Sequence, residues 1–228
     1  MHPLDNPIWQ SLTTTHERFA ETRDSARRFI REVSVLAALS APTPENYHSL
    51  ASLLKPDERV GLFLQTAPAP PVSWTVVDTG PIFQMVCEKR VPPDPASNGT
   101  KLISLNNRDV PEMLALTKLT KPGPFNARTY EMGDYLGIRS AGTLAAMAGE
   151  RLRLRSYTEV SAVCTHPDHL GHGYATVLMT TLMTRIHDRS EVPFLHVRPE
   201  NVRAIQLYER LGFVKRASLH YAVIRKNP

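Results

Sequence analysis

The chain has 228 residues, of which 42% are hydrophobic and 21% charged, with a formal net charge of +5 and an isoelectric point of 9.4. This composition is typical of a soluble globular protein and excludes a membrane-spanning segment, while the absence of a signal peptide and of a disulfide framework predicts a cytoplasmic protein. Arginines are scattered without a dense basic run, so the positive charge favours a phosphate-rich small cofactor over nucleic acid.

The first half of the chain predicts short helices and strands but contains no motif that indicates chemistry. Helices are expected within residues 5–20 and over residues 44–54, where apolar side chains recur at helical spacing. Strands are expected within residues 29–39 and at residues 59–64, 72–78 and 82–87. Residues 90–100 contain three prolines and a glycine, which predicts a linker. We therefore expect an N-terminal α/β half over residues 1–95, of undetermined role, and a second domain over residues 101–228.

After this linker the sequence alternates between strands and helices. Apolar periodicity predicts helices over residues 110–120, 173–188 and 202–211. Strands are predicted at residues 101–105, 135–139, 143–150, 157–165, 194–198, 214–216 and 219–225. Asp109 and Asn201 are expected to cap the helices that follow them, and Gly212 to end the last helix. The alternation predicts a mixed α/β sheet flanked by helices.

The most informative segment is the turn between the predicted strand at residues 157–165 and the predicted helix at residues 173–188. Gly171 and Gly173 allow the backbone to approach an anion without a Cβ in the way, and the start of the helix leaves backbone N–H groups unpaired. Such a row of amides is suited to bind a phosphate. We favour this role over the alternative in which the glycines only allow the helix to begin.

Two blocks of sequence carry a family likeness: H-P-D-x-x-G-x-G-x-A over residues 166–175 and N-x-x-A-I-x-L-Y-E-x-L-G-F over residues 201–213. Together they resemble the GNAT superfamily of CoA-dependent N-acyltransferases, and the resemblance covers about residues 101–228. The chain looks most like the glycine N-acyltransferase-like branch, which also has an N-terminal half and a glutamate eight residues before the loop proline, here Glu159 and Pro167.

The resemblance implies a GNAT-like mixed sheet that splays between the strand before the glycine turn and the following strand. Pantetheine is then expected in the gap, the pyrophosphate on the loop amides, and the N-terminal half as a degenerate copy of the same fold. Acyl-CoA, above all acetyl-CoA, is the implied co-substrate, and no metal is implied. The implied cofactor contacts are Val163, Thr165, Leu170, Gly171, His172, Gly173, Tyr174, Ala175 and Asn201.

Two positions of the glycine turn depart from the family pattern. Asp168 stands where the family often has Arg or Gln, and Leu170 where it commonly has Arg or Lys. Cationic side chains are therefore missing at these points, and a carboxylate at residue 168 is expected to oppose anion binding. The backbone amides are expected to carry most of the affinity for CoA.

By the same resemblance, two residues are expected to carry the acid–base chemistry. Glu159 takes the proton of the attacking amine, because partial burial in a strand is expected to raise its pKa toward neutrality. The alternative is a structural ion pair with one of the nearby arginines, Arg151, Arg153 or Arg155. Tyr208 protonates the departing CoA thiolate, or is a core tyrosine with a satisfied hydroxyl.

Several histidines also invite a functional interpretation. His166, His169 and His172 lie within seven residues, but their spacing does not match the common zinc pairs, so we interpret them as solvated loop residues. His196 and Arg198, at the end of the strand predicted at residues 194–198, either shape the acceptor site or are structural.

Cys164 raises the question of a covalent acyl-enzyme. Strict alternation along the strand groups Glu159, Ser161 and Val163 on one face and Val160, Ala162 and Cys164 on the other. Cys164 is thus expected to point away from Glu159, which favours direct attack of the amine on the thioester.

These observations predict an N-acyltransferase that transfers an acyl group, above all acetyl, from acyl-CoA to a primary amine of a small molecule or amino acid. The backbone N–H near Val163 is expected to stabilise the oxyanion. A non-catalytic acyl-CoA-binding or interaction module is the alternative function. The identity of the amine and the oligomeric state, a homodimer included, are left open by the sequence.

Overall fold

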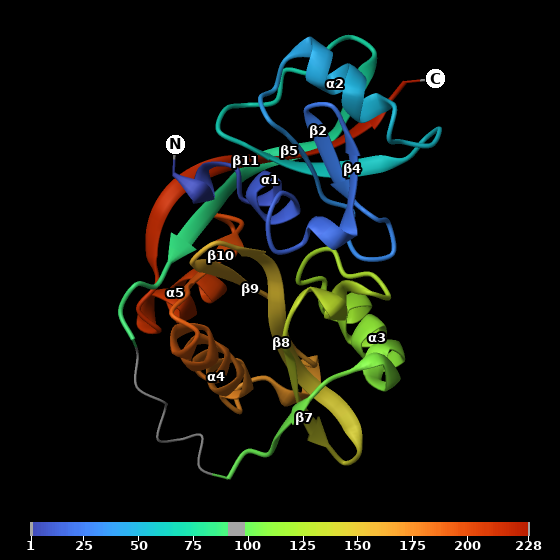
Figure 1. The fold of residues 1–228 in the computed structure, drawn as a ribbon. Coiled ribbons are helices and arrows are strands. Elements are labelled where there is room, and N and C mark those ends of the chain that lie inside the picture. Colours follow the sequence, from blue (N-terminus) through green and yellow to red (C-terminus); the bar gives the residue numbers. More distant parts are fainter. Residues whose placement is uncertain (1, 91–98, 228) are drawn as a thin grey trace.

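The computed structural model describes residues 2–90 and 99–227, and residues 91–98 of the predicted linker lie outside the described residues (Figure 1). Its centre is a mixed sheet built from β4 (Arg59–Leu64), β5 (Trp74–Val86), β6 (Leu102–Ser104), β7 (Tyr135–Ser140), β8 (Thr143–Leu154), β9 (Tyr157–Thr165), β10 (Val192–Val197) and β11 (Val214–Lys226). Along the sheet the order is β4-β11-β5-β10-β9-β8-β7-β6. The expected mixed α/β fold is confirmed.

The remaining elements surround this sheet. A smaller antiparallel sheet contains β1 (Ala20–Arg23), β2 (Ala26–Phe29) and β3 (Ala37–Leu39), and the helices are α1 (Pro7–Leu12), α2 (Pro44–Ala51), α3 (Val110–Thr120), α4 (Tyr174–Asp188) and α5 (Val202–Arg210). Among the described residues, no helix is both long and apolar enough to cross a membrane. Because β4 and β5 belong to the main sheet, the first half of the chain contributes to the same core as the second. A domain division at the linker stays a prediction, as does the origin of the first half as a copy of the fold.

Helices cover both faces of the main sheet. Side chains of β10 alternate between these faces: Leu195 and Val197 pack with α4, whereas Phe194 packs with α1. The α4 face also carries α5, and the opposite face is covered by α1 and, further along the sheet, by α3 (Figure 1). The sheet therefore separates a C-terminal helical layer from a layer formed largely by the N-terminal half.

Two pairs of predicted strands are in fact single long strands. Residues 72–78 and 82–87 are joined in β5, and residues 214–216 and 219–225 in β11. The prediction of a break was wrong because Gly80 and Pro81 are compatible with a strand at this place. Residues 74–82 of β5 pair only with β11, so Pro81 needs no N–H on its free side.

The expected splay of the sheet is present between β9 and β10. These parallel strands pair at only three positions, the last of which joins Phe194 to Glu159. Beyond it, β9 continues along β8 to Thr165, while β10 continues along β5 to Val197. A fork therefore opens in the sheet at Glu159 and Phe194.

Candidate active site

The glycine turn leaves a run of backbone N–H groups free. Gly171 and Gly173 have φ values of 86° and 74°, and a Cβ added at either position would meet no atom within 4 Å. Gly173 is the N-cap of α4 and has no side chain to cap it. Within the described chain, the N–H groups of residues 171–176 donate to no protein acceptor. The positive end of the helix dipole and these free amides together form a site suited to an anion.

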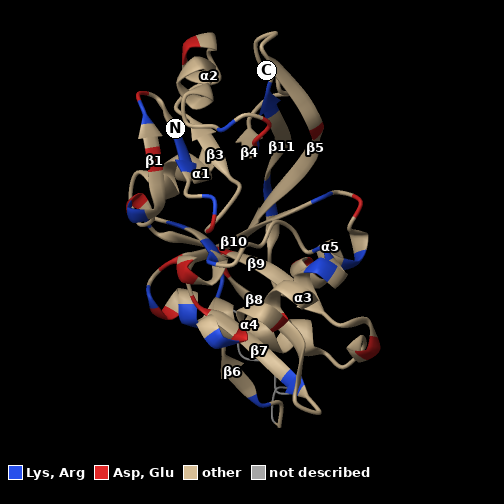
Figure 2. Ribbon diagram, turned by 90° about the vertical axis from the view of Figure 1, so that its right-hand side faces the viewer, with Lys and Arg blue, Asp and Glu red and all other residues tan. Residues whose placement is uncertain are grey.

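The side chains around this turn face solvent. Asp168 has a side chain 82% exposed, with its carboxylate 3.6 Å from Nδ1 of His166. The rings of His166, His169 and His172 follow one another with centroids about 6 Å apart. Among the described residues, no group of three or more potential ligands is placed to hold a metal ion. Lys and Arg are interspersed with Asp and Glu along the ribbon (Figure 2).

A β-bulge in β9 changes which side chains face each side of the fork. Gly149 of β8 pairs with Ser161 and Met147 with Cys164, so Ala162 and Val163 together lie opposite a single residue of β8. Ala162 has a φ of 53°, a left-handed conformation that the local sequence does not predict. Neither Ala162 nor Val163 therefore has a pairing partner in β8.

The expected orientation of Cys164 was therefore wrong. Val163 packs with Val160 on the α4 face, whereas Ala162 and Cys164 lie in the cluster under α3, on the face that Glu159 shares. Burial raises the pKa of the Cys164 thiol to about 11. Because a thiol with this pKa stays protonated near neutral pH, it is a poor nucleophile. The preference for direct attack thus rests on the protonation of Cys164 and not on its direction.

Glu159 is fully buried at the branch point of the fork. Arg151 donates to it through two bonds, from Nε to Oε2 at 2.8 Å and from Nη2 to Oε1 at 2.6 Å. Nδ1 of His196 lies 2.7 Å from the same Oε1. Burial alone would raise the pKa of this carboxyl, but the charge and hydrogen bonds of Arg151 and the bond to His196 outweigh it and lower the pKa to about 2. The expected rise in pKa was wrong, because strand position alone does not reveal these partners.

Tyr208 lies on α5, on the other side of the sheet, and Asn201 is the N-cap of this helix. Tyr208 packs on the core of the α4 face, with its ring centroid 6.0 Å from that of Phe213. Burial raises the pKa of its phenol to about 12, and within the described residues its hydroxyl makes no hydrogen bond. Asn201 caps α5 by accepting the N–H of Ala204 at 3.2 Å, as expected from the sequence. The sheet thus lies between Tyr208 and Glu159.

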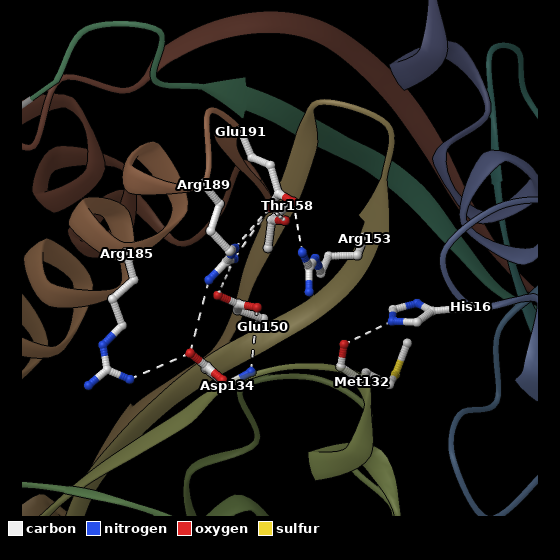
Figure 3. A network of polar contacts seen from close by, with 9 residues as sticks. All are labelled: His16, Met132, Asp134, Glu150, Arg153, Thr158, Arg185, Arg189 and Glu191. Atoms are coloured by element: carbon white, nitrogen blue, oxygen red, sulfur yellow. Dashed lines mark hydrogen bonds and ion pairs between the residues drawn. The ribbon is translucent and has the colours of Figure 1, made fainter.

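Ion pairs hold β9 and β10 together on the closed side of the fork (Figure 3). Glu191, just before β10, accepts bonds from Oγ1 of Thr158 at 2.5 Å and from Arg153 at 2.8 Å. Arg189 lies 2.7 Å from Glu150 and 3.3 Å from Glu191. Burial raises the pKa of Glu150 despite this cation. Since these contacts join the ends of the two strands, they fix the point from which the fork opens.

Some residues near the fork were not predicted from the sequence as part of the site. Gln84 of β5 is fully buried, and its Nε2 lies 3.1 Å from Nε2 of His196. Arg216 of β11 donates to Oε1 of Gln84 at 2.8 Å. The sequence does contain a signal for Gln84, because it is the one polar residue in the apolar run of residues 82–86. Arg198, by contrast, lies at the surface and pairs with Asp78 at 3.2 Å.

Comparisons with known proteins agree with this arrangement. Residues 135–222 match the family model of FR47-like proteins. A solved structure assigned to the GNAT family of acetyltransferases, from Novosphingobium aromaticivorans, is 36% identical over 100% of both chains, with a TM-score of 0.90.

Two more distant structures share the fold alone. A GCN5-related N-acetyltransferase from Kribbella flavida is 16% identical over 89% of this chain and 88% of its own, with a TM-score of 0.59. A GCN5-related N-acetyltransferase-like protein from Streptococcus suis is 12% identical over 97% and 92%, with a TM-score of 0.58. No curated protein matches the chain. The likeness to the Novosphingobium protein over the whole length shows that this chain belongs to the GNAT family of acetyltransferases.

Proposed function

We propose that this GNAT acetyltransferase transfers the acyl group of acyl-CoA, above all acetyl-CoA, to a primary amine of a small molecule or amino acid. The single observation that carries the proposal is the pairing of two features: the free amides of residues 171–176 and the fork that opens between β9 and β10. An anion site and an opening in the sheet, joined by the short segment after Thr165, suit a thioester whose long arm is attached to a diphosphate. The glycine N-acyltransferase-like branch, and with it an amino-acid acceptor, are part of this proposal.

The cofactor contacts follow from these two features. The backbone of Gly171, His172, Gly173, Tyr174 and Ala175 receives the diphosphate, and Leu170, 49% exposed, borders it. In the fork, the backbone at Val163 and Thr165 faces the pantetheine, and the side-chain amide of Asn201 remains free to donate because only its oxygen is used as a cap. Asp168 points into solvent, which limits its repulsion of the diphosphate.

The reaction we propose is direct attack of the amine on the thioester carbon. The carbonyl oxygen becomes an oxyanion as the C–N bond forms, and the N–H of Val163, released from the ladder by the bulge, donates to it. Loss of the thiolate then breaks the C–S bond. Tyr208 donates its proton to the thiolate and regains one from solvent. Because burial raises the pKa of the free phenol to about 12, above that of a thiol, this transfer requires that the pKa falls in the bound complex.

Glu159 is the remaining member of the proposed machinery. It is ionised, as a base must be, but a carboxyl with a pKa of about 2 accepts protons weakly. It therefore serves as the base only in a complex where the substrate displaces Arg151 or His196 from its oxygens. Without such displacement the proton of the amine leaves through water, and Glu159 is a positioning residue that aligns these two side chains at the fork.

Glu159→Gln is expected to lower kcat roughly 100-fold, the usual scale of lost acid–base catalysis, while leaving the affinity for acyl-CoA within about twofold. If Glu159 is the base, the acid limb that its titration gives to the pH–rate profile disappears in the variant, whereas an equal loss at every pH identifies the positioning role. Glu58→Gln makes the same change in a buried ion pair of the N-terminal half, with Arg28 at 2.8 Å, and kcat is expected to stay near wild type. A wild-type kcat for Glu159→Gln would remove this residue from the reaction.

The function itself is tested by release of free CoA thiol from acetyl-CoA in the presence of amines, with glycine and other amino acids first and polyamines second. We expect thiol release that depends on the amine, together with a mass increase of the amine by one acetyl group. If acetyl-CoA raises the melting temperature but no amine gives thiol release, the non-catalytic binding module is the better function. A cytoplasmic location is proposed with this activity, since Cys87 and Cys164 are both free and buried.

A further inference from the structure

A row of polar side chains crosses the main sheet on the face that α1 covers. Each of five neighbouring strands contributes one residue: Arg151 of β8, Glu159 of β9, His196 of β10, Gln84 of β5 and Arg216 of β11. Asp5, in the N-terminal 3₁₀ turn, ends the row with its Oδ1 2.6 Å from Nη2 of Arg216. The row is buried through Gln84 and becomes partly exposed at Arg216 and Asp5. It connects the N-terminal segment to the branch point of the fork.

The orientation of the Gln84 amide is fixed by two independent contacts. Arg216 donates from Nη1 to Oε1 at 2.8 Å, and a guanidinium has no acceptor to offer. The carbonyl oxygen of Leu4, which can only accept, lies 2.9 Å from Nε2. Both contacts place the oxygen of Gln84 toward β11 and its NH₂ group toward His196. Gln84 therefore donates to Nε2 of His196 across 3.1 Å.

This direction determines where His196 carries its proton. If Nε2 receives a hydrogen bond from Gln84, it holds a lone pair, and the proton of the neutral imidazole is on Nδ1. That N–H donates to Oε1 of Glu159 at 2.7 Å. A proton on Nε2 would set two buried donors against each other with no acceptor between them, which is costly in a protein interior. In each hydrogen bond of the series Arg216, Gln84, His196 and Glu159, the donor is therefore the residue nearer to Arg216.

We propose that Gln84 and Arg216 are positioning residues that hold His196 as the Nδ1–H tautomer and so keep a donor on Glu159. The local backbone supports this role, because Arg216 is the extra residue of a β-bulge between Lys215 and Ala217, and bulges redirect side chains. The inference that these residues affect turnover rests on the proposed role of Glu159 as a positioning residue, whereas the tautomer of His196 does not depend on it.

The tautomer is tested by NMR of protein labelled with ¹⁵N-histidine at pH 7, with His196 assigned by its loss in His196→Gln. We expect one ring nitrogen of the protonated type at Nδ1 and one of the unprotonated type at Nε2. In Gln84→Glu a carboxylate oxygen replaces the donor, so Nε2 is expected to gain a proton while Nδ1 keeps its own. A wild-type proton on Nε2, or an unprotonated Nε2 in folded Gln84→Glu, would overturn the proposal.

The positioning role is tested by kinetics. Gln84→Met is expected to lower kcat about tenfold, a typical effect of a misplaced catalytic group, without changing KM for acyl-CoA. Gln65→Met is the matched control, because Gln65 also donates to a carbonyl of the N-terminal segment, that of Asp5 at 2.6 Å, but does not contact His196. Equal kcat values for Gln84→Met and this control would contradict the positioning role.

A second pair of variants covers the case in which Gln84 variants do not fold. Arg216 is partly exposed, so Arg216→Met is expected to fold and to lower kcat several-fold, and Arg216→Lys, which retains a donor, to restore it. Failure of the lysine variant to restore kcat would contradict the proposal. If the expected tautomer is found but Glu159→Gln keeps the wild-type kcat, the role proposed for Glu159 fails while the tautomer assignment stands.

Discussion

Gly173→Val is expected to weaken the binding of acetyl-CoA by roughly 100-fold, equivalent to the loss of one or two charge-assisted hydrogen bonds to the diphosphate. The φ of 74° at Gly173 is a left-handed conformation that a β-branched residue adopts only under strain. The backbone is then expected to leave this conformation, so that the N–H groups of residues 171–176 no longer converge. Isothermal titration calorimetry with acetyl-CoA measures the change.

Gly142→Val supplies a matched control for this prediction. Gly142 lies in the turn between β7 and β8, has a φ of 85°, and, like Gly173, would place a Cβ with no atom within 4 Å. The two substitutions introduce similar backbone strain, and each is expected to reduce the free energy of unfolding by about 1–2 kcal/mol. Only Gly173→Val is expected to lose affinity. Equal affinities in the two variants would mean that the amides of the glycine turn do not hold the diphosphate.

The glycine turn could be predicted from the sequence because all that it requires is local. Two glycines, a preceding strand and the start of a helix lie within about twenty residues, and the left-handed φ values follow from residue type. The same holds for Asn201, whose cap depends on the N–H of Ala204 three residues later. Features of this kind depend only on residues that are close in the sequence, so they can be predicted from it.

The charge state of Glu159 could not be predicted in this way. Arg151 was one of three arginines that the sequence offered as partners, and only the register of β8 against β9 selects it. His196 and Gln84 reach the same place because β5, from the first half of the chain, lies beside β10. The bulge at Ala162 has no local signal either, since alanine rarely has a positive φ. The family resemblance therefore located the fork and Glu159, whereas periodicity along the strand did not give the face of Cys164 or the pKa of Glu159.

Arg151→Met is expected to reduce the free energy of unfolding by about 3–5 kcal/mol, because it leaves the buried carboxylate of Glu159 without its cation. The double variant Arg151→Met/Glu159→Gln removes both charges and is expected to recover most of this loss. Arg198→Met breaks an exposed ion pair with Asp78 and is expected to cost at most about 1 kcal/mol. Urea unfolding at pH 7 measures all three, and a double variant no more stable than Arg151→Met would contradict the argument.

The same prediction has a definite pH dependence. The pKa of Glu159 is about 2 in the folded protein against an ordinary value of 4.5, so its pairing stabilises the wild type fully above pH 4.5 and this contribution is lost as the pH falls toward 2. Arg151→Met lacks the contribution at every pH. In the variant, burial raises the pKa of the unpaired Glu159 carboxyl, so protonation relieves part of its cost as the pH falls. The difference in unfolding free energy between wild type and variant should therefore be largest at pH 8 and narrow as the pH falls toward 2. A difference that stays constant down to pH 3 would show that the ionised carboxylate is not what Arg151 stabilises.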